Sequence, residues 1–151
     1  SGAQGGTGPA GSTGDAPAGS RVTSYGYRND ETPDRNSTAG IGAFVSDDEI
    51  ARIKAGEDTP NKIKEGDLAV SRDVEKTLRK AGFSPGDELQ VNFADGTSQT
   101  TRWMDRTADV WDGKTVTGRW DFYRAGKKDR HSKDGGKVTG FGPVEPFGPP
   151  Q

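Results

Sequence analysis

The chain is short of several residue types that proteins use for chemistry and for packing. It has no cysteine, one histidine, and hydrophobic residues at only 28% of its 151 positions. The lack of cysteine excludes disulfide bonds, thiolate catalysis and Cys-ligated metal sites. No apolar run is long enough to span a bilayer. The interspersed charges, with a net value of −2, give no electrostatic case for nucleic-acid binding. We therefore predict no metal or other cofactor, no membrane span and no nucleic-acid partner.

Both ends of the chain have little to bury. Residues 1–20 contain only Gly, Ala, Ser, Thr and Pro besides one Gln and one Asp, a composition typical of a disordered linker. Residues 125–151 are rich in Lys, Asp, Gly and Pro and are predicted to form a flexible tail, of which Phe141, Val144 and Phe147 dock at most weakly onto the domain. We therefore expect one folded, monomeric domain over residues 21–124.

The single histidine, His131, falls in the Lys-rich part of the predicted tail, where we expect it to be solvated. A lone solvated histidine does not predict a metal site. Serine hydrolysis is also unsupported, because the predicted domain contains no histidine to act as the base.

The predicted domain is mainly β. The sequence favours short helices over 46–55, where Ser46 and Glu49 form a capping box, and over 71–81, followed by Gly82. Alternating apolar residues and turn signals predict strands over 22–27, 68–70, 88–93, 100–104, 110–111 and 115–123. In the strand over 88–93, the apolar side chains share one face. Several short strands with one or two helices favour a compact barrel.

Two aspartates lie in strand segments among aromatic residues. Asp105 follows Trp103-Met104, and Asp121 lies between Trp120 and Phe122. Because side chains in a strand alternate between its faces, Trp120 and Phe122 point into the core while Asp121 points away from it. A carboxylate in such surroundings is a candidate for a shifted pKa and for proton transfer.

The sequence leaves structural alternatives open for these residues. Asp121 is either a catalytic acid or a structural hydrogen-bond acceptor. Asp105 has Arg102 and Arg106 close in sequence, so we expect a lowered pKa and an ionised group. Asp105 then orients a partner or forms a salt bridge in a loop.

Aromatic side chains have the same two alternatives. Tyr25, Trp103 and Trp111 are candidates to stack on sugar rings, with core packing as the alternative. Trp120 is assigned to the core.

A set of short motifs follows in a fixed order along the domain. The motifs lie at 22–26 (Val-Thr-Ser-Tyr-Gly), 38–40 (Thr-Ala-Gly), 68–70 (Leu-Ala-Val), 85–91 (Pro-Gly-Asp-Glu-Leu-Gln-Val), 105–108 (Asp-Arg-Thr-Ala) and 121–123 (Asp-Phe-Tyr). Their order resembles that of double-psi β-barrels such as rare lipoprotein A and expansins. It is most similar to the three-aspartate domain of A-type murein lytic transglycosylases.

This resemblance implies a six-stranded double-psi β-barrel in a secreted or cell-envelope protein of bacteria. It implies that Asp121 is the acid/base of lytic peptidoglycan cleavage, with Asp105 beside it on a neighbouring strand. The implied substrate-binding residues are Tyr25, Trp103, Arg106, Thr107 and Tyr123. The partner would be the peptidoglycan glycan strand, and no cofactor is implied.

The chain departs from the family pattern at several positions. The family's first aspartate falls on Ser71, with Asp73 the nearest carboxylate, and the Asp-Thr-Gly-Gly turn has become 105–108. Residues 46–65 resemble an insertion. The second hypothesis is therefore a non-catalytic module that binds glycan or a protein partner.

Overall fold

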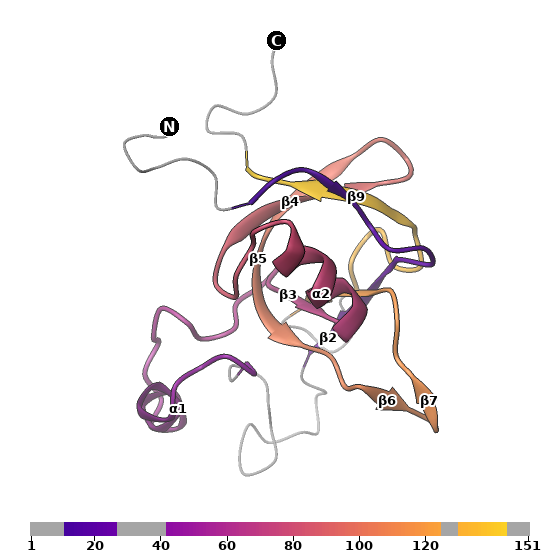
Figure 1. Cartoon of the computed structure of the whole chain (residues 1–151). Helices are drawn as coiled ribbons and strands as arrows, with labels where there is room; N and C mark the ends of the chain where they lie inside the picture. Colours follow the sequence, from indigo (N-terminus) through magenta and orange to yellow (C-terminus); the bar gives the residue numbers. More distant parts are fainter. Residues whose placement is uncertain (1–10, 27–41, 125–129, 145–151) are drawn as a thin grey trace.

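The computed structural model describes residues 11–26, 42–124 and 130–144, and within these ranges the protein is mainly β (Figure 1). The strands are β1 (Gly14–Asp15), β2 (Arg21–Tyr25), β3 (Leu68–Val70), β4 (Glu88–Phe93), β5 (Ser98–Arg106), β6 (Val110–Trp111), β7 (Lys114–Thr115), β8 (Arg119–Tyr123) and β9 (Val138–Gly142). The helices are α1 (Asp47–Lys54) and α2 (Arg72–Lys80). The predicted mainly-β class with two short helices is confirmed.

Seven of these strands form one mixed sheet in the order β1-β9-β4-β5-β3-β8-β2. Its centre is unusual in that β3 pairs in parallel with β5 on one side and antiparallel with β8 on the other. The edge strand β2 pairs in parallel with β8. Strands β6 and β7 form a separate hairpin. The pairings among the described strands leave the sheet open and do not close it into a barrel.

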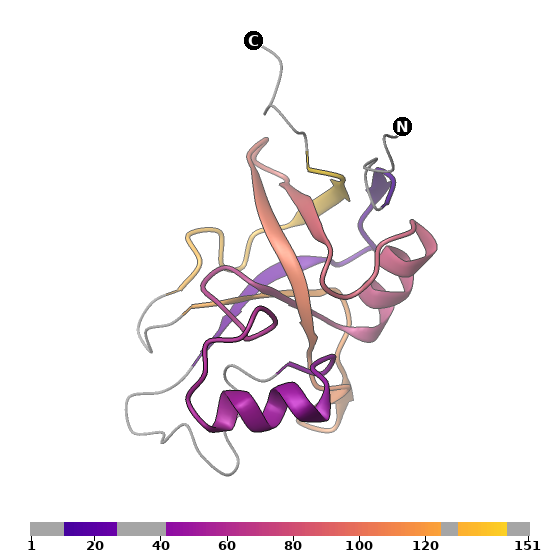
Figure 2. The same cartoon turned by 90° about the vertical axis from the view of Figure 1, so that its left-hand side faces the viewer.

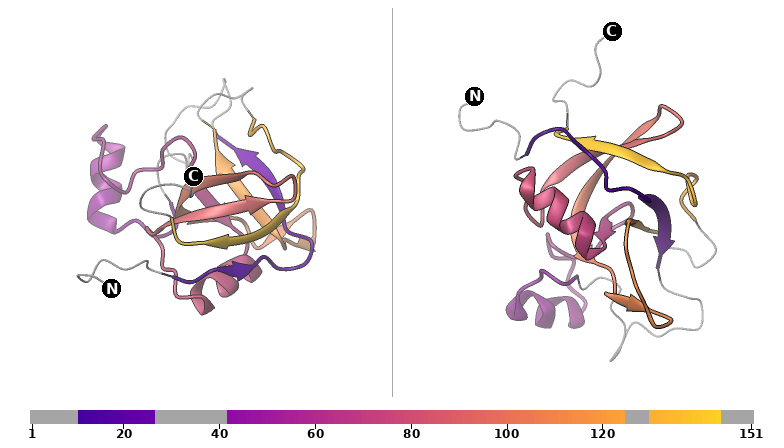
Figure 3. Two further views of the ribbon diagram at one scale, coloured as in Figure 1. Left: turned by 90° about the horizontal axis from the view of Figure 1, so that it is seen from above. Right: turned by 45° about the vertical axis from the view of Figure 1, so that its right-hand side comes forward.

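The two ends of the described chain lie against each other (Figure 3). β1 pairs antiparallel with β9, and this contact continues beyond both strands. Val138 N–H donates to Ser20 O at 3.0 Å, and Val22 N–H donates to Gly136 O at 2.9 Å. Residues 14–22 thus run beside 135–141 before β2 turns to β8, which links the β2 edge to the stretch that leads into β9.

The core lies between the strands and α2, and it is built by the alternation of side chains. In β4, Leu89 and Val91 are 0% exposed and Phe93 is 5% exposed, whereas the residues between them are only partly buried or exposed. The predicted inward face of this strand is confirmed. The other large side chains with under 2% exposure include Trp103, Trp120, Phe122, Phe141, Leu68, Leu78, Val22, Val70 and Val74.

The predicted linker and tail are wrong where the structure describes them. β1 lies within the predicted linker, and β9 lies within the predicted tail. A Cβ at Gly14 would lie 2.7 Å from the ring of Phe141, and one at Gly11 would lie 2.4 Å from the ring of Phe83. These glycines therefore allow the chain to pass close over aromatic rings, a role that composition does not separate from flexibility. Residues 1–10, 27–41, 125–129 and 145–151 lie outside the described residues.

The helices begin where the sequence predicts, but their caps differ in detail. At α1, Ser46 Oγ accepts the N–H of Glu49 at 3.2 Å. The Glu49 carboxylate does not complete the capping box, because it binds the side chain of Thr59 and the N–H of Asn61. It therefore joins the start of α1 to the loop that follows it.

We expect Gly14→Val to destabilise the fold by about 1–3 kcal/mol, the usual range for overpacking. The added side chain meets the Phe141 ring, which cannot move away because it packs against Phe83 and Trp120. The measurement is the free energy of unfolding in denaturant. Ala18→Val, at an exposed position of the same segment, is the control and should change it little. Equal stability of the two variants would contradict the packing of Gly14 against Phe141 and would support the predicted linker over residues 11–20.

Candidate functional site

Two aspartates lie in one row across the sheet. Ala69 of β3 pairs with Asp105 of β5 on one side and with Asp121 of β8 on the other, and Asp121 pairs with Thr23 of β2. Directly paired residues point to the same face of a sheet. Two strand spacings separate the Cα atoms of Asp105 and Asp121, which is roughly 10 Å. The expectation that their strands are direct neighbours is wrong, because β3 lies between them.

This face is the one opposite the main core. Trp120 and Phe122 are 0% exposed on the core side, as the alternation in β8 predicts. Beside the aspartates, a second apolar cluster forms from Ile63, Met104 and Tyr123, with Tyr25 packed against it. Ile63 of this cluster belongs to the chain that follows α1, and Figure 2 shows α1 and that chain on one side of the sheet. The two aspartates therefore lie on the face of the sheet that also carries this second apolar cluster.

Burial dominates the behaviour of Asp121. It raises the pKa of this carboxyl group to about 6, against the hydrogen bond from Thr23 and the charge of Arg119, which lower it. Thr23 Oγ1 donates to Asp121 Oδ1 at 2.8 Å. The charges of Asp134 and Asp105 raise the pKa further but are the smallest contributions. The carboxyl group that the sequence marks as a candidate for a shifted pKa thus has one, and burial is its main cause.

Asp105 is held by backbone groups. Its Oδ1 accepts the N–H of Ala43 at 2.8 Å and that of Arg106 at 2.7 Å. Burial raises its pKa, while these two bonds and the charge of Arg106 lower it. The expectation of a lowered pKa for Asp105 is therefore wrong, because desolvation outweighs the opposing effect of Arg106.

The two arginines form ion pairs elsewhere. Arg102 Nη2 lies 2.7 Å from Asp67 Oδ2, and Arg102 also donates to the carbonyl oxygens of Pro60 and Lys62. This set fastens the loop before β3. A cavity of about 290 Å³ adjoins the pair. The cavity is lined by Lys64, Glu65, Gly66, Asp67, Glu88, Thr100, Thr101 and Arg102.

Arg106, a predicted substrate-binding residue, forms an ion pair with a buried carboxylate. Its guanidinium forms a bidentate pair with Glu75 of α2, at 2.7 Å and 2.8 Å. Arg79 binds the same carboxylate at 2.9 Å. The hydrogen bond from Arg106 is the largest cause that lowers the pKa of Glu75, to about 2. Arg106 also lies over the ring of Phe44, at 4.9 Å from its centroid, and so ties α2 and the segment before α1 to the end of β5.

Of the predicted sugar-contacting aromatics, Trp103 and Tyr123 pack inside the protein. Trp103 is 0% exposed and Tyr123 is 6% exposed, so neither ring is available for stacking. Trp103 Nε1 donates to Asp105 O at 3.1 Å and helps to place that residue. Thr107 is half-buried, and its N–H donates to Val70 O at 2.9 Å. Trp111 is 72% exposed on the β6–β7 hairpin.

Tyr25 is the predicted aromatic that lies at the aspartates. Its ring meets that of Tyr123 edge to face, with centroids 5.4 Å apart. Its hydroxyl is buried and has no hydrogen-bond partner among the described residues. Burial, and then the charges of Asp105 and Asp121, raise the pKa of Tyr25. The site therefore contains a neutral tyrosine hydroxyl near two carboxyl groups, and this hydroxyl donates no hydrogen bond to a described residue.

Sequence reasoning missed Thr23 as the residue that holds Asp121. Its signal was the alternation of β2, which places Thr23 and Tyr25 on one face. The Ser71 position, where the family has its first aspartate, has a structural role. Ser71 Oγ donates to Asp73 at 2.6 Å and accepts the N–H of Arg119 at 2.9 Å, while Asp73 accepts the N–H of Gly118. The pair fixes the turn that enters β8.

The prediction of a solvated His131 is wrong. The residue is 6% exposed, and its ring lies over that of Phe122 at 4.6 Å between centroids. Its Nδ1 accepts the N–H of Lys133 at 3.0 Å, and its Nε2 contacts Gln99 Oε1. This pattern requires the neutral ring with its proton on Nε2. Burial is the largest cause that lowers the pKa of His131.

Comparison with protein-family models, with curated proteins and with solved structures finds no match to this chain. In the described ranges, neither helix is long and apolar enough to cross a membrane. The same residues contain no group of three or more His, Cys, Asp or Glu side chains that could hold a metal ion.

We expect Asp121→Asn to stabilise the protein at neutral pH. A folded-state pKa raised from 3.8 to about 6 means that ionising Asp121 costs the folded state up to about 3 kcal/mol above pH 6. This cost is absent below pH 3.8 and grows as the pH rises through the window to about 6. The measurement is the free energy of unfolding of both proteins from pH 3.5 to 8. An advantage of the variant that does not grow with pH would contradict the raised pKa.

We expect the stability contributed by His131 to be lost as the pH falls. Its folded-state pKa is lowered, so the unfolded chain binds the proton first, and the native protein loses stability below pH ~6.5. His131→Phe cannot titrate and loses the bonds to Lys133 and Gln99. The stability gap between wild type and variant should be widest near pH 8 and should narrow toward pH 5. A gap that widens on acidification would contradict the neutral ring.

Proposed function

We propose that this domain acts on the glycan strand of bacterial peptidoglycan and cleaves it lytically with Asp121 as acid and then base. The observation that carries the proposal is the environment of Asp121, a half-buried carboxyl group with a pKa of about 6 that is held by Thr23. Beside it lies the hydroxyl of Tyr25, which has no hydrogen-bond partner among the described residues. A general acid works best when its pKa lies near the operating pH.

The reaction needs one carboxyl group. Protonated Asp121 gives its proton to the glycosidic oxygen, the bond to the anomeric carbon breaks, and positive charge develops on the sugar ring. The carboxylate then takes the proton of the 6-hydroxyl of the same sugar, whose oxygen bonds to the anomeric carbon and closes an anhydro ring. The proton returns to Asp121, so the residue ends the cycle as it began.

Asp105 is assigned a supporting role. Closure of the anhydro ring by the 6-hydroxyl of the sugar requires no second carboxylate as a nucleophile. Asp105 is fixed by two backbone N–H groups, and its charge stabilises positive charge on the sugar when it is ionised.

Tyr25 is assigned the role of a substrate-binding donor. A buried hydroxyl without a partner costs about 1–3 kcal/mol, and a sugar oxygen that accepts its proton would remove that cost. Thr107, next to Asp105 in the chain, is the remaining predicted contact with a half-buried side chain. Trp103, Tyr123 and Arg106 support the site from inside the protein.

The proposed fold type is a six-stranded double-psi barrel, formed by β2, β3, β4, β5, β8 and β9. Two features support it. The hydrogen bonds between Val22 and the 135–136 segment join the β2 edge to the β9 side, and β3 lies between a parallel β5 and an antiparallel β8. Location in the cell envelope or outside the cell follows from the proposed substrate.

A second candidate is a glycan-binding module without cleavage. The hydrogen bonds of both aspartates favour it, because the bonds from Thr23 to Asp121 and from Ala43 to Asp105 serve the fold even when no substrate is bound.

The test is digestion of purified peptidoglycan sacculi, with mass spectrometry for anhydro-muropeptides. The wild type should release them, and Asp121→Asn should lower the rate by about 10²-fold or more while remaining folded. Asp105→Asn should lower it less. Tyr25→Phe should lower the rate of release without destabilising the protein, because the Tyr25 hydroxyl forms no hydrogen bond with a described residue. The exposed Asp58→Asn is the matched control.

Release of no anhydro product by the wild type, or full activity of Asp121→Asn, would reject the catalytic proposal. Binding of sacculi without release of any anhydro product would leave the glycan-binding module as the function.

A further inference from the structure

The β6–β7 hairpin exposes an apolar surface that the site described above does not use. Val110 and Trp111 are the exposed large hydrophobic residues of the described chain, at 57% and 72%. The turn is tight, with positive φ values of 53° at Asp112 and 76° at Gly113, which fits a two-residue hairpin loop. A hairpin of this length is not stable alone in water, so its contacts with the rest of the protein hold it in place.

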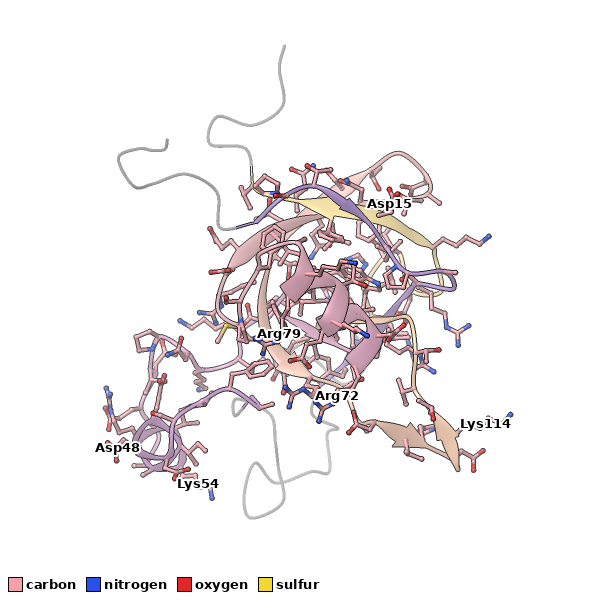
Figure 4. All side chains as sticks on the ribbon, viewed as in Figure 1. Asp15, Asp48, Lys54, Arg72, Arg79 and Lys114 are labelled. Atoms are coloured by element: carbon pink, nitrogen blue, oxygen red, sulfur yellow. The ribbon has the colours of Figure 1, made fainter. Side chains whose placement is uncertain are left out.

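The contacts at the base of the hairpin join it to β3 and to α2. Thr107 N–H donates to Val70 O of β3, and Val116 N–H donates to Asp109 O within the base of the hairpin, both at 2.9 Å. Asp109 also forms an ion pair with Arg72, in the first turn of α2, at 2.9 Å. In Figure 4, Arg72 lies next to the base of the hairpin and Lys114 lies at its far end.

The register determines which side chains share a face of the hairpin. Trp111 pairs with Lys114 and Val110 with Thr115, and the Val116–Asp109 hydrogen bond places Asp109 opposite Val116, two pairs from Trp111. Side chains two residues apart share a face, so Trp111 and Lys114 lie on the side of Asp109. Since Asp109 binds Arg72 on that side, Trp111 and Lys114 are turned toward the face that carries α2.

The exposed face of α2 is basic. Arg72, Lys76, Arg79 and Lys80 are all exposed, and their spacing places them along one side of the helix. The acidic residues of α2 point elsewhere, since Asp73 binds the N–H of Gly118 and Glu75 is buried against Arg106. Within the part of the chain that the structure describes, no ion pair involves Lys76, Lys80 or Lys114.

We propose that Trp111, Lys114 and the basic face of α2 form a second binding surface, which takes an anionic glycan bearing carboxylates. An exposed indole offers a flat apolar surface for the face of a sugar ring, and the lysines provide cations for carboxylates beside it. The identification of this glycan as peptidoglycan, whose peptides carry carboxylates, rests on the proposed function.

The hairpin is linked to the site through β5. This strand carries Asp105 and ends at Arg106, and the hairpin follows after residues 107–109. Arg106 shares the buried Glu75 with Arg79 of the basic face. A nucleic acid is the other polyanion that such a surface could take, and the experiment tests it as an alternative.

The experiment measures binding of soluble peptidoglycan fragments that retain their peptides, by isothermal titration calorimetry. Asp121→Asn serves as the parent protein, so that cleavage does not disturb the measurement. Trp111→Ala and Trp111→Leu should each weaken binding by about tenfold, because both remove the aromatic face on which a sugar ring stacks. A combined Lys76→Gln, Lys80→Gln, Lys114→Gln variant should also bind more weakly and should lose most of the salt dependence.

The matched control replaces Lys54, Lys64 and Lys137 by Gln, three exposed lysines on other elements, and should bind like the parent. Neutral chito-oligosaccharides should bind more weakly, with little effect of salt. Parent-like binding by the Trp111 variants, or by the lysine variant, would overturn the proposal. Tighter binding of single-stranded DNA than of the fragments would also overturn it.

The outcome is separable from the cleavage test. If the wild type releases no anhydro product but binding still requires Trp111, cleavage fails and the surface stands. If cleavage occurs and Trp111 has no effect on binding, the surface fails and the proposed function stands.

Discussion

The alternation of side chains in β8 is the constraint on which the core and the candidate site both depend. Trp120 and Phe122 fill the interior, at 0% exposure, and the same backbone must then direct Asp121 to the opposite face. β8 also pairs with both β2 and β3, so its register fixes Thr23 and Ala69 beside Asp121. A shift by one residue would bury the carboxylate in the core and expose both aromatic rings.

This arrangement makes the candidate site a source of instability that the rest of the fold must offset. The carboxyl group of Asp121 is buried with one hydrogen-bond donor, Thr23, and the hydroxyl of Tyr25 has no partner among the described residues. Natural proteins keep such groups mainly where function needs them. Glu75, a carboxylate with a structural role, differs from Asp121 in the direction of its pKa shift, because its arginine partners lower its pKa to about 2.

Contacts between segments far apart in the chain hold this site in place. The run of residues 14–22 beside 135–141 ties β2 to the β9 side, and His131 covers Phe122 directly behind Asp121. Arg102 fastens the loop before β3, and Arg106 fastens α2. Because these contacts link the two ends and the middle of the chain, the geometry at Asp121 depends on the whole described domain.

The elements whose signals are local could be predicted from the sequence. The strand over 88–93, both helices, the hairpin turns and the inward side chains Leu89, Val91, Trp120 and Phe122 follow from periodicity, caps and glycines. The strand predicted over 115–123 is present only from Arg119, as β8. The mainly-β class followed as well, and so did the candidacy of Asp121, because its neighbours in the chain are also its structural surroundings.

The ion pairs, pKa shifts and burial of the other candidate residues could not be predicted from the sequence, because they depend on contacts with residues that are distant in the chain. Asp105 has a raised pKa because burial outweighs Arg106, and Arg102 turns to Asp67, although sequence proximity predicted that both arginines would act on Asp105. Trp103, Tyr123 and His131 became interior residues for the same reason. The glycines at 11 and 14 pack against Phe83 and Phe141. The composition of a segment indicates only how readily its residues remain exposed. Whether the glycines are buried depends on the aromatic rings that the folded chain places against them.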